Sequence, residues 1–415
     1  MNAVRVIESM VYVGQCFSSP ARLRRSINRF VTINSMYKSL LQLALFVSGI
    51  LMPQLLPQTQ AQPTPERLYV GTYSTRGSQG IYTFAFDRKT GRLTQTGATS
   101  NDRSPSFLAL HPSKRFLYSV NESSDGTNGV SAYAITAKTG ALTLLNRASS
   151  EGGGPCHVSV DRTGRLAFIS AYGGGTFAAL PIGTDGRLGV TAFRMKYEGS
   201  NPANPRQDAP HIHSATVSPD NRFVYVADLG TDRVYTYAID AKRQRVSPAA
   251  TPFVTVRTGS GPRHMAIHPN GRFAYLVAEL ASSVVAFSRD PKTGALTVLQ
   301  ERVGTLPADF SSNNTSADIH IDPSGRFVYQ SNRGLNALAM LTVADDGKIR
   351  LNGATPTEGK TPRNFWVDPK GEFVIVANQD TDNLVVFRRD AQTGRLTPTG
   401  ETASVPSPVC VISGN

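Results

Sequence analysis

A short stretch of this sequence places a guanidinium, an imidazole and a carboxylate where two neighbouring β-strands would meet. Arg263 and His264 open one apolar strand, and Glu279 follows the next. Because the start of one strand lies beside the end of the next in an antiparallel hairpin, we expect Arg263 and Glu279 to be neighbours. A carboxylate or an imidazole can take a proton from water, and a guanidinium can stabilise an oxyanion. The stretch therefore favours hydrolysis of an ester-like anion.

Other copies of the same pattern carry polar residues at equivalent positions. His211 and His213 come from one neighbouring copy, and Asp318 and Arg333 come from the other. The second guanidinium, on Arg333, suits bidentate binding of a carboxylate or phosphate. More distant copies contribute His157, Glu122 and Asn364. Polar, varied residues at equivalent positions of a regular repeat indicate a site on one face.

The element that positions these residues is a recurring β-hairpin. Stretches such as GPRHMAIHPNGRFAYLVAEL at 261–280 alternate apolar residues around a tight turn, as β-hairpins do. The aromatic residue or leucine after the turn recurs at intervals of 50, 57, 50, 54 and 46 residues. Its positions are Phe116, Leu166, Phe223, Phe273, Phe327 and Phe373. This period is typical of a four-stranded propeller blade.

A second set of turns, each bearing a glycine and exemplified by DRKTGRLT at 87–94, lies out of phase with the first, and seven copies can be counted if a degenerate one is included. Each repeat therefore holds two hairpins. The seventh inner hairpin can be assembled from ERLYVGTY at 66–73 and SPVCVIS at 407–413. Pairing these segments closes a ring. We predict an all-β fold, a seven-bladed β-propeller of four-stranded blades, over residues 62–415.

The first 61 residues lie outside the repeat. A short positive region begins at Met36, an apolar segment follows, and Thr59-Gln60-Ala61 fits a small-x-small cleavage site. We predict a signal peptide over 36–61, cleaved near Ala61, and a periplasmic or secreted protein. We interpret residues 1–35 as an extension upstream of the true start. The alternative is an uncleaved membrane anchor, which the prolines of the apolar segment disfavour.

The charge and the cysteine content limit the kinds of ligand and partner that the chain is expected to bind. Removing the +5 carried by residues 1–61 from the formal net charge of +13 leaves +8, scattered through turns. This pattern argues against nucleic-acid binding and favours anionic small molecules. Cys156 and Cys410 fall on blades that are not neighbours, so we expect no disulfide. His211 and His213 could form a metal pair, but no acidic cluster accompanies them. We predict a monomer with no metal, no cofactor and no membrane contact after cleavage.

Three further histidines are interpreted as residues outside the functional site. His111 and His268 fall in hairpin turns, where we expect them to face solvent. His320 lies in the middle of a strand, where we expect a packed, structural side chain. The arginine that precedes each aromatic marker repeats with the blade, so we interpret it as architectural.

The combination of PHIHS at 210–214, GPRH at 261–264 and a glutamate sixteen residues after the arginine resembles the lactonase family of seven-bladed propellers. That family groups propeller-type 6-phosphogluconolactonases with 3-carboxymuconate cyclases, and the resemblance spans residues 66–413. It implies a metal-independent active site. We predict as catalytic residues Glu279, Arg263, His213 and His211, and as substrate-binding residues Arg333, His264, His157, Asp318, Glu122 and Asn364.

The resemblance implies hydrolysis of a sugar lactone or a related anionic lactone. A muconate-type lactonising cycloisomerase is the second enzymatic hypothesis. A non-catalytic propeller that serves as a binding or cell-envelope scaffold is the third, because fold alone does not fix function. Side chains that converge on one pocket would favour an enzyme, and side chains that point apart would favour a scaffold.

Overall fold

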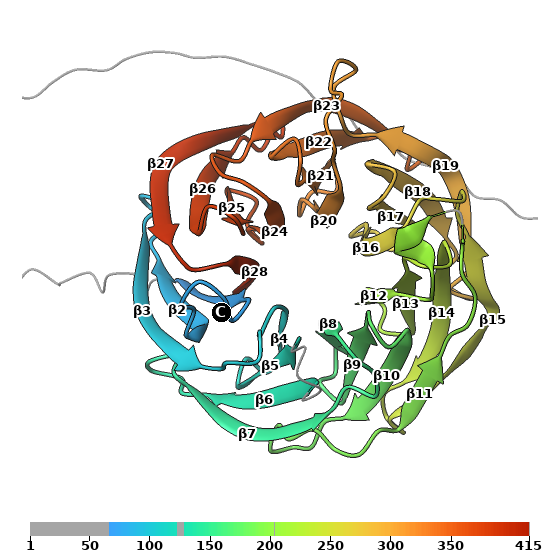
Figure 1. Cartoon of the computed structure of the whole chain (residues 1–415), viewed down its shortest axis with the longest axis horizontal. Coiled ribbons are helices and arrows are strands. Elements are labelled where there is room, and N and C mark those ends of the chain that lie inside the picture. The colour runs from blue at the N-terminus through green and yellow to red at the C-terminus, as the bar shows by residue number, and fades with distance from the viewer. Residues whose placement is uncertain (1–65, 123–127, 203, 415) are drawn as a thin grey trace, which may run out of the picture. The chain divides into compact units, whose positions relative to one another are not determined.

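A computed structural model describes residues 66–122, 128–202 and 204–414 of the chain. They form seven four-stranded antiparallel sheets arranged in a ring (Figure 1), and the centre of the ring is the position of a propeller's channel. The predicted all-β, seven-bladed propeller is thereby confirmed. The predicted signal peptide and upstream extension lie outside the described residues.

Six of the blades run along the chain from their innermost strand outward, and the seventh takes its innermost strand from the C-terminal part of the described chain. From the innermost strand outward, the first blade consists of β28 (Pro408–Ser413), β1 (Glu66–Thr72), β2 (Gly80–Phe86) and β3 (Leu93–Ser100). The second blade consists of β4 (Leu108–Leu110), β5 (Phe116–Asn121), β6 (Gly129–Ile135) and β7 (Leu142–Ser149). The third blade consists of β8 (Pro155–Val160), β9 (Leu166–Ala171), β10 (Thr176–Pro181) and β11 (Phe193–Lys196). The fourth and fifth are β12 (Ile212–Val217), β13 (Phe223–Asp228), β14 (Arg233–Asp240) and β15 (Arg245–Thr255); and β16 (Pro262–Ile267), β17 (Phe273–Ala278), β18 (Ser283–Arg289) and β19 (Leu296–Gly304). The last two are β20 (Ser316–Ile321), β21 (Phe327–Asn332), β22 (Ala337–Val343) and β23 (Ile349–Pro356); and β24 (Pro362–Val367), β25 (Phe373–Asn378), β26 (Asn383–Arg389) and β27 (Leu396–Ser404).

Burial changes from the inside of a blade to its outside. In β17 all six residues of the sequence FAYLVA are buried, because neighbouring blades cover both faces of the strand. The outermost strand β27 is mostly exposed, since it has solvent on one side. The core lies between blades: Phe223 and Tyr225 of β13 share one cluster with Leu276 of β17 and Val285 of β18.

The two repeated turn signals of the sequence meet at each blade junction. Gly294 has a φ of +76°, and a Cβ there would lie 2.5 Å from the ring of Phe223 in the preceding blade. Only glycine fits that conformation and that contact. The Tyr225 hydroxyl donates to the carbonyl of Gly294 at 2.9 Å, and Arg222 donates to two carbonyls of the same turn at 3.0 Å each. The architectural interpretation of this arginine therefore fits the structure.

The turn histidines also join blades, which corrects the expectation that they face solvent. His111 and His268 are half-buried. A ring nitrogen of His111 lies 2.9 Å from the Gly164 carbonyl, and one of His268 lies 3.1 Å from the Gly325 carbonyl. Each glycine leaves room for the imidazole of the preceding blade.

Six inner strands among the described residues carry a register irregularity near their starts. The shifts fall between Pro155 and His157, Ile212 and Ser214, Pro262 and Met265, Ser316 and Ile319, Pro362 and Asn364, and Pro408 and Cys410. A bulge breaks the strict alternation of side chains between the two faces of a strand. Accordingly, consecutive residues Arg263 and His264 both line one small cavity in the channel.

Ring closure follows the expected pairing. β28 lies antiparallel to β1, with Leu68 opposite Ser413 and Val70 opposite Val411. Residues near both ends of the described chain therefore complete one blade (Figure 1).

Deleting residues 404–415 is expected to destabilise the ring, because β1 loses its inner neighbour and exposes a strand edge. The lost burial of Val409, Cys410 and Val411 should cost several kcal/mol of unfolding free energy. Thermal unfolding and the soluble yield of the truncated protein measure this effect. A truncated protein that melts at the temperature of the parent would contradict the role of the pairing.

Candidate active site

Glu279 is the centre of a buried charged cluster at one end of the channel. It directly follows β17, and its side chain is 2% exposed. Its oxygen Oε2 lies 3.0 Å from Nε of Arg263, which β16 of the same blade supplies. Its oxygen Oε1 lies 2.9 Å from Nη2 of Arg333, which follows β21 of the next blade. The expected adjacency of these three residues is present.

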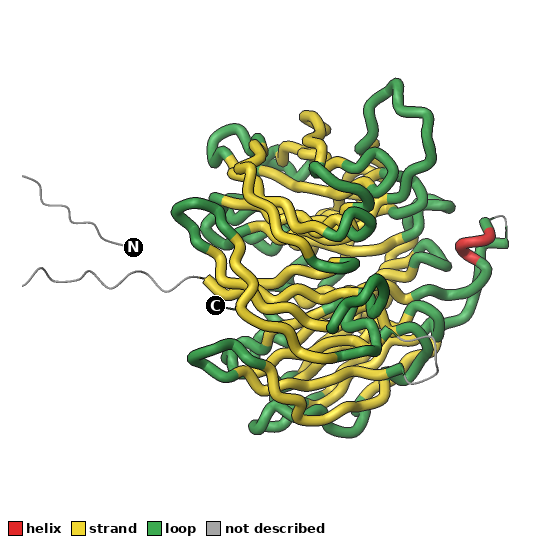
Figure 2. Tube along the Cα trace, turned by 60° about the vertical axis from the view of Figure 1, so that its left-hand side comes forward, coloured by secondary structure: helices red, strands yellow, loops and turns green. Residues whose placement is uncertain are grey.

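A third guanidinium reaches the same carboxylate from outside the repeat. Arg206 lies in the connection between β11 and β12, within the short 3-10 helix η1 (Pro205–Gln207). Its Nη2 lies 3.1 Å from Oε1 of Glu279 and 3.1 Å from the Tyr172 hydroxyl. Figure 2 shows η1 on a loop beyond the strand ends, on the side away from the C-terminal end of the chain.

The guanidiniums fix the charge of Glu279. Burial alone would raise the pKa of Glu279, but Arg333, Arg263 and Arg206 together hold this pKa at about 2. Burial lowers the pKa of Arg263 to about 10, with Arg363 as the next cause, so Arg263 remains a cation at neutral pH. A carboxylate with so low a pKa is a weak proton acceptor. Guanidiniums also lie against both of its oxygens, so Glu279 is suited to hold guanidiniums in place rather than to accept a proton.

His213 offers a neutral imidazole beside the cluster. Its Nε2 lies 3.9 Å from Oε2 of Glu279, and the side chain is 6% exposed. Burial, followed by the charge of Arg263, lowers the pKa of His213 well below 6.5. The Cys156 sulfur lies 3.8 Å from its Nδ1. Cys156 and Cys410 are both free and buried, as expected.

His211, also predicted to be catalytic, has both ring nitrogens occupied. Its Nδ1 lies 3.1 Å from the Tyr172 carbonyl, and its Nε2 lies 3.0 Å from Oδ1 of Asp208. The imidazole stacks on the Tyr172 ring with centroids 4.2 Å apart and an interplanar angle of 11°. The geometry suits a residue that anchors the Arg206 connection better than one that exchanges protons.

Four other predicted binding residues and one phenylalanine that was not predicted form a second layer across the channel. We call this layer the belt, and its members are His157, His264, Asp318, Asn364 and Phe107. Asp318 bonds His264 Nδ1 at 2.8 Å and accepts from the Asn364 amide at 2.6 Å. Asn364 in turn accepts from the backbone N–H of Val411 at 2.7 Å. Burial would raise the pKa of Asp318, but its histidine partners hold it well below its usual range.

Glu122 lies across the channel in another environment. It bonds the Ser106 hydroxyl and lines one small cavity with Arg263, His264 and Arg363. Burial raises the pKa of Glu122 despite the opposing charge of Arg363. The two carboxylates of the channel, Glu122 and Glu279, thus differ in their affinity for a proton.

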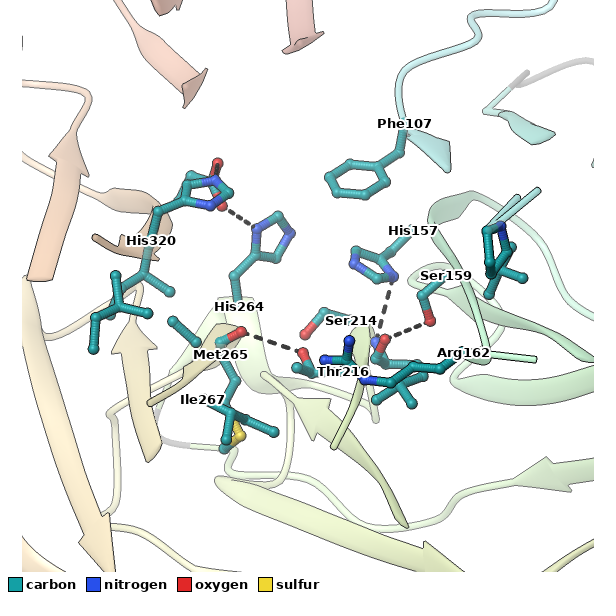
Figure 3. A pocket seen from close by; sticks show the side chains of 18 residues that line it. Phe107, His157, Ser159, Arg162, Ser214, Thr216, His264, Met265, Ile267 and His320 are labelled. Atoms are coloured by element: carbon teal, nitrogen blue, oxygen red, sulfur yellow. Dashed lines mark hydrogen bonds and ion pairs between the residues drawn. The ribbon is translucent and has the colours of Figure 1, made fainter. Parts of the chain in front are cut away.

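A larger cavity of about 640 Å³ lies beyond the belt (Figure 3). Phe107, His157 and His264 project toward it, with ring centroids 4.3 to 5.6 Å apart. His320 also lines this cavity, is 38% exposed and bonds Asp318 at 2.9 Å, which corrects the expectation of a packed residue. The cavity is not lined by Glu279, Arg333 or Arg206. We favour the Glu279 cluster as the reaction site for another reason, because guanidiniums that can stabilise an oxyanion meet a neutral imidazole there.

Several residues of the cluster were absent from the sequence-based set. Tyr172 and Arg363 occupy the same repeat positions as Glu279 and Arg263, so the repeat alignment could have identified them. Arg206 has no repeat equivalent. Its only signal was the 57-residue interval, the longest of the series, which marks an insertion.

Two kinds of feature are absent from the described part of the chain. No group of three or more His, Cys, Asp or Glu side chains there could hold a metal ion. No helix within residues 66–122, 128–202 and 204–414 has the length and apolar character needed to cross a membrane.

Comparison with known proteins identifies the family. Residues 67–413 match the family model described as Lactonase, 7-bladed beta-propeller. The chain is 37% identical over 346 residues to the 6-phosphogluconolactonase of Bacillus subtilis, covering 83% of this chain and 97% of the relative. It is 33% identical over 335 residues to that of Formosa agariphila, covering 79% and 94%. A solved structure, the periplasmic gluconolactonase of Pseudomonas aeruginosa, is 32% identical with a TM-score of 0.79, covering 84% of this chain and 98% of that one. The chain belongs to the lactonase family of seven-bladed β-propellers.

Proposed function

We propose that the chain hydrolyses a sugar lactone or a related anionic lactone at the Glu279 cluster. The observation that carries this proposal is the convergence of Arg263, Arg333 and neutral His213 on one buried carboxylate. Family membership and the lactonase names of the relatives support it. Convergent side chains also favour an enzyme over a scaffold.

In the proposed reaction, His213 takes a proton from water as the water oxygen attacks the lactone carbonyl. The carbonyl oxygen becomes an oxyanion, which Arg263 stabilises. The ring C–O bond then breaks, and the ring oxygen receives the proton from His213. The product is an open hydroxy acid, and the imidazole is neutral again. Glu279 keeps the guanidiniums oriented throughout.

A lactone screen tests the activity. The purified chain is mixed with aldonolactones, phosphorylated aldonolactones and muconolactones, and acid release is followed at constant pH. We expect opening of a sugar lactone above the spontaneous rate. Cyclisation of a muconate, with no sugar lactone opened, would favour the cycloisomerase. Neither reaction at any lactone concentration would favour the scaffold.

Export is the second part of the proposal. The signal-peptide pattern over 36–61 and the periplasmic relative from Pseudomonas aeruginosa both support it. N-terminal sequencing of the protein recovered from its native cell is expected to begin near Gln62. Recovery from the cytosol of a chain that begins at Met1 would contradict export.

A further inference from the structure

We infer that Arg206, together with Arg333, binds an anionic oxygen group of the substrate and thereby selects anionic over neutral lactones. This inference rests on the proposed function and names the substrate class of the same site. It assigns Arg206 as a specificity-determining residue.

Both arginines bind the same carboxylate oxygen. Nη2 of Arg333 and Nη2 of Arg206 lie 2.9 Å and 3.1 Å from Oε1 of Glu279. Arg263 approaches the other oxygen, so three positive charges surround one negative charge. Such a surplus favours a second anion at the cluster. Among the described residues, Nε of Arg333 is buried without a hydrogen-bond partner, so a donor remains available there.

The exposure of the three arginines gives the site a direction. The side chains of Arg263, Arg333 and Arg206 are 3%, 14% and 48% exposed. An anionic group that enters from solvent therefore meets Arg206 first and Arg333 next. The deepest guanidinium, on Arg263, is left for the reacting carbonyl. A lactone would enter with its ring first and its anionic substituent toward the mouth.

The connection that carries Arg206 is held at several points. Asn204 accepts from the backbone N–H of Arg206 at 2.9 Å, which caps η1. The fully buried Gln207 donates to the Leu229 carbonyl at 2.7 Å. His211 anchors the far end on Tyr172. A guanidinium held in this way loses little freedom on binding an anion, which favours affinity.

The phosphate or carboxylate character of the anion is distinguished by three substrates. They are 6-phosphoglucono-δ-lactone, a glucaric acid monolactone that keeps a free carboxylate, and neutral glucono-δ-lactone. We expect Arg206→Ala to raise KM for an anionic lactone roughly tenfold to a hundredfold. We expect kcat to change by less than about threefold, and KM for the neutral lactone to change little, because the lost contact is to the anion alone. A larger effect on the phosphorylated lactone than on the carboxylate lactone identifies phosphate, and the reverse identifies carboxylate.

Arg206→Lys and Arg194→Ala are the companion variants. Lysine keeps the positive charge but lacks the planar, bidentate donor group of arginine. Arg206→Lys should therefore recover part of the affinity for anionic lactones that Arg206→Ala loses. Arg194 lies on the outermost strand of its blade, and its side chain is 50% exposed, so its replacement removes the same charge from a similarly exposed position. Arg206→Ala should fold normally, because the cap uses its backbone N–H. An equal rise in KM for charged and neutral lactones, or the same change in Arg194→Ala, would overturn the inference.

A binding measurement separates this inference from the proposed function. Calorimetric titration with 6-phosphogluconate, glucarate and gluconate needs no turnover. We expect wild type to bind at least one of the two ligands with a second anionic group, 6-phosphogluconate or glucarate, more tightly than gluconate, and Arg206→Ala to lose most of that preference. The same preference in both proteins would overturn the role of Arg206, even if the chain is a lactonase. A preference that depends on Arg206, in a protein that opens no lactone, would refute the hydrolase and leave Arg206 as an anion-binding residue.

Discussion

Arg263→Ala is expected to lower kcat for lactone opening by roughly 10²- to 10³-fold, the usual effect of removing one oxyanion donor. Arg263 is the most deeply buried of the three guanidiniums that contact Glu279. In so dry a position its attraction to a developing negative charge is weakly screened. Since that charge exists mainly in the transition state, KM should change much less than kcat. Steady-state kinetics on the best lactone of the screen measures both.

The fold should survive this replacement, because Glu279 keeps Arg333 and Arg206 as partners. Arg289→Ala is the matched control. Arg289 is 1% exposed and paired with Asp220 at a blade junction, so its loss should reduce stability without the kcat effect. Equal losses of kcat in the two variants, after correction for the folded fraction, would show that Arg263 is architectural. Undiminished turnover in Arg263→Ala would remove it from the mechanism.

His213→Gln is expected to lower kcat by roughly 10²- to 10⁴-fold, the usual range for loss of a general base. The base form is the neutral imidazole, which exists above the pKa of His213. Because burial lowers that pKa well below 6.5, kcat/KM should stay high as the pH falls through 6.5 and decline only in more acidic solution. A pH profile of wild type and His213→Gln measures this, and the variant should lack the decline.

Glu279→Gln separates the two candidate bases. If Glu279 only orients the arginines, its variant loses rate but keeps the acid decline that belongs to His213. A decline that disappears in Glu279→Gln and persists in His213→Gln would reverse the two roles. His268→Gln is the control for loss of an imidazole, since His268 bonds a turn carbonyl at a blade junction.

The fold could be predicted because its signals are periodic. The aromatic markers and the turn glycines recur because they contact each other at the blade junctions, as Gly294 and Phe223 do. The split seventh hairpin could be recognised because its two halves match the repeated hairpin. The pairing of Arg263 with Glu279 followed from hairpin geometry alone. The bulge at the start of the inner strands could not be predicted in this way, because no residue type is specific to it. Since the bulge was not predicted, the sequence did not indicate that the charged cluster and the belt are separate layers.

The remaining differences between prediction and structure concern residues that lie outside the repeat or residues whose contacts the repeat does not reveal. Arg206 sits on an insertion, so alignment of the repeats could not place it beside Glu279. His211 matches a motif shared with the family, but Tyr172 and Asp208 occupy its nitrogens. The turn histidines were expected in solvent because turns usually are exposed. The next blade covers them here, a contact that a single hairpin does not reveal.

The pairing of β28 with β1 sets the order in which the molecule can be completed during synthesis. Every other described strand precedes β28 in the chain, so six blades can be assembled before the first has its innermost strand. Val70 can pair with Val411 only after the last strand has been made. This pairing closes a loop that contains nearly the whole propeller, which is an entropically costly step. An emerging chain consequently has an open ring until its last strand is made. For a protein that crosses a membrane while unfolded, this delay would extend the time available for translocation.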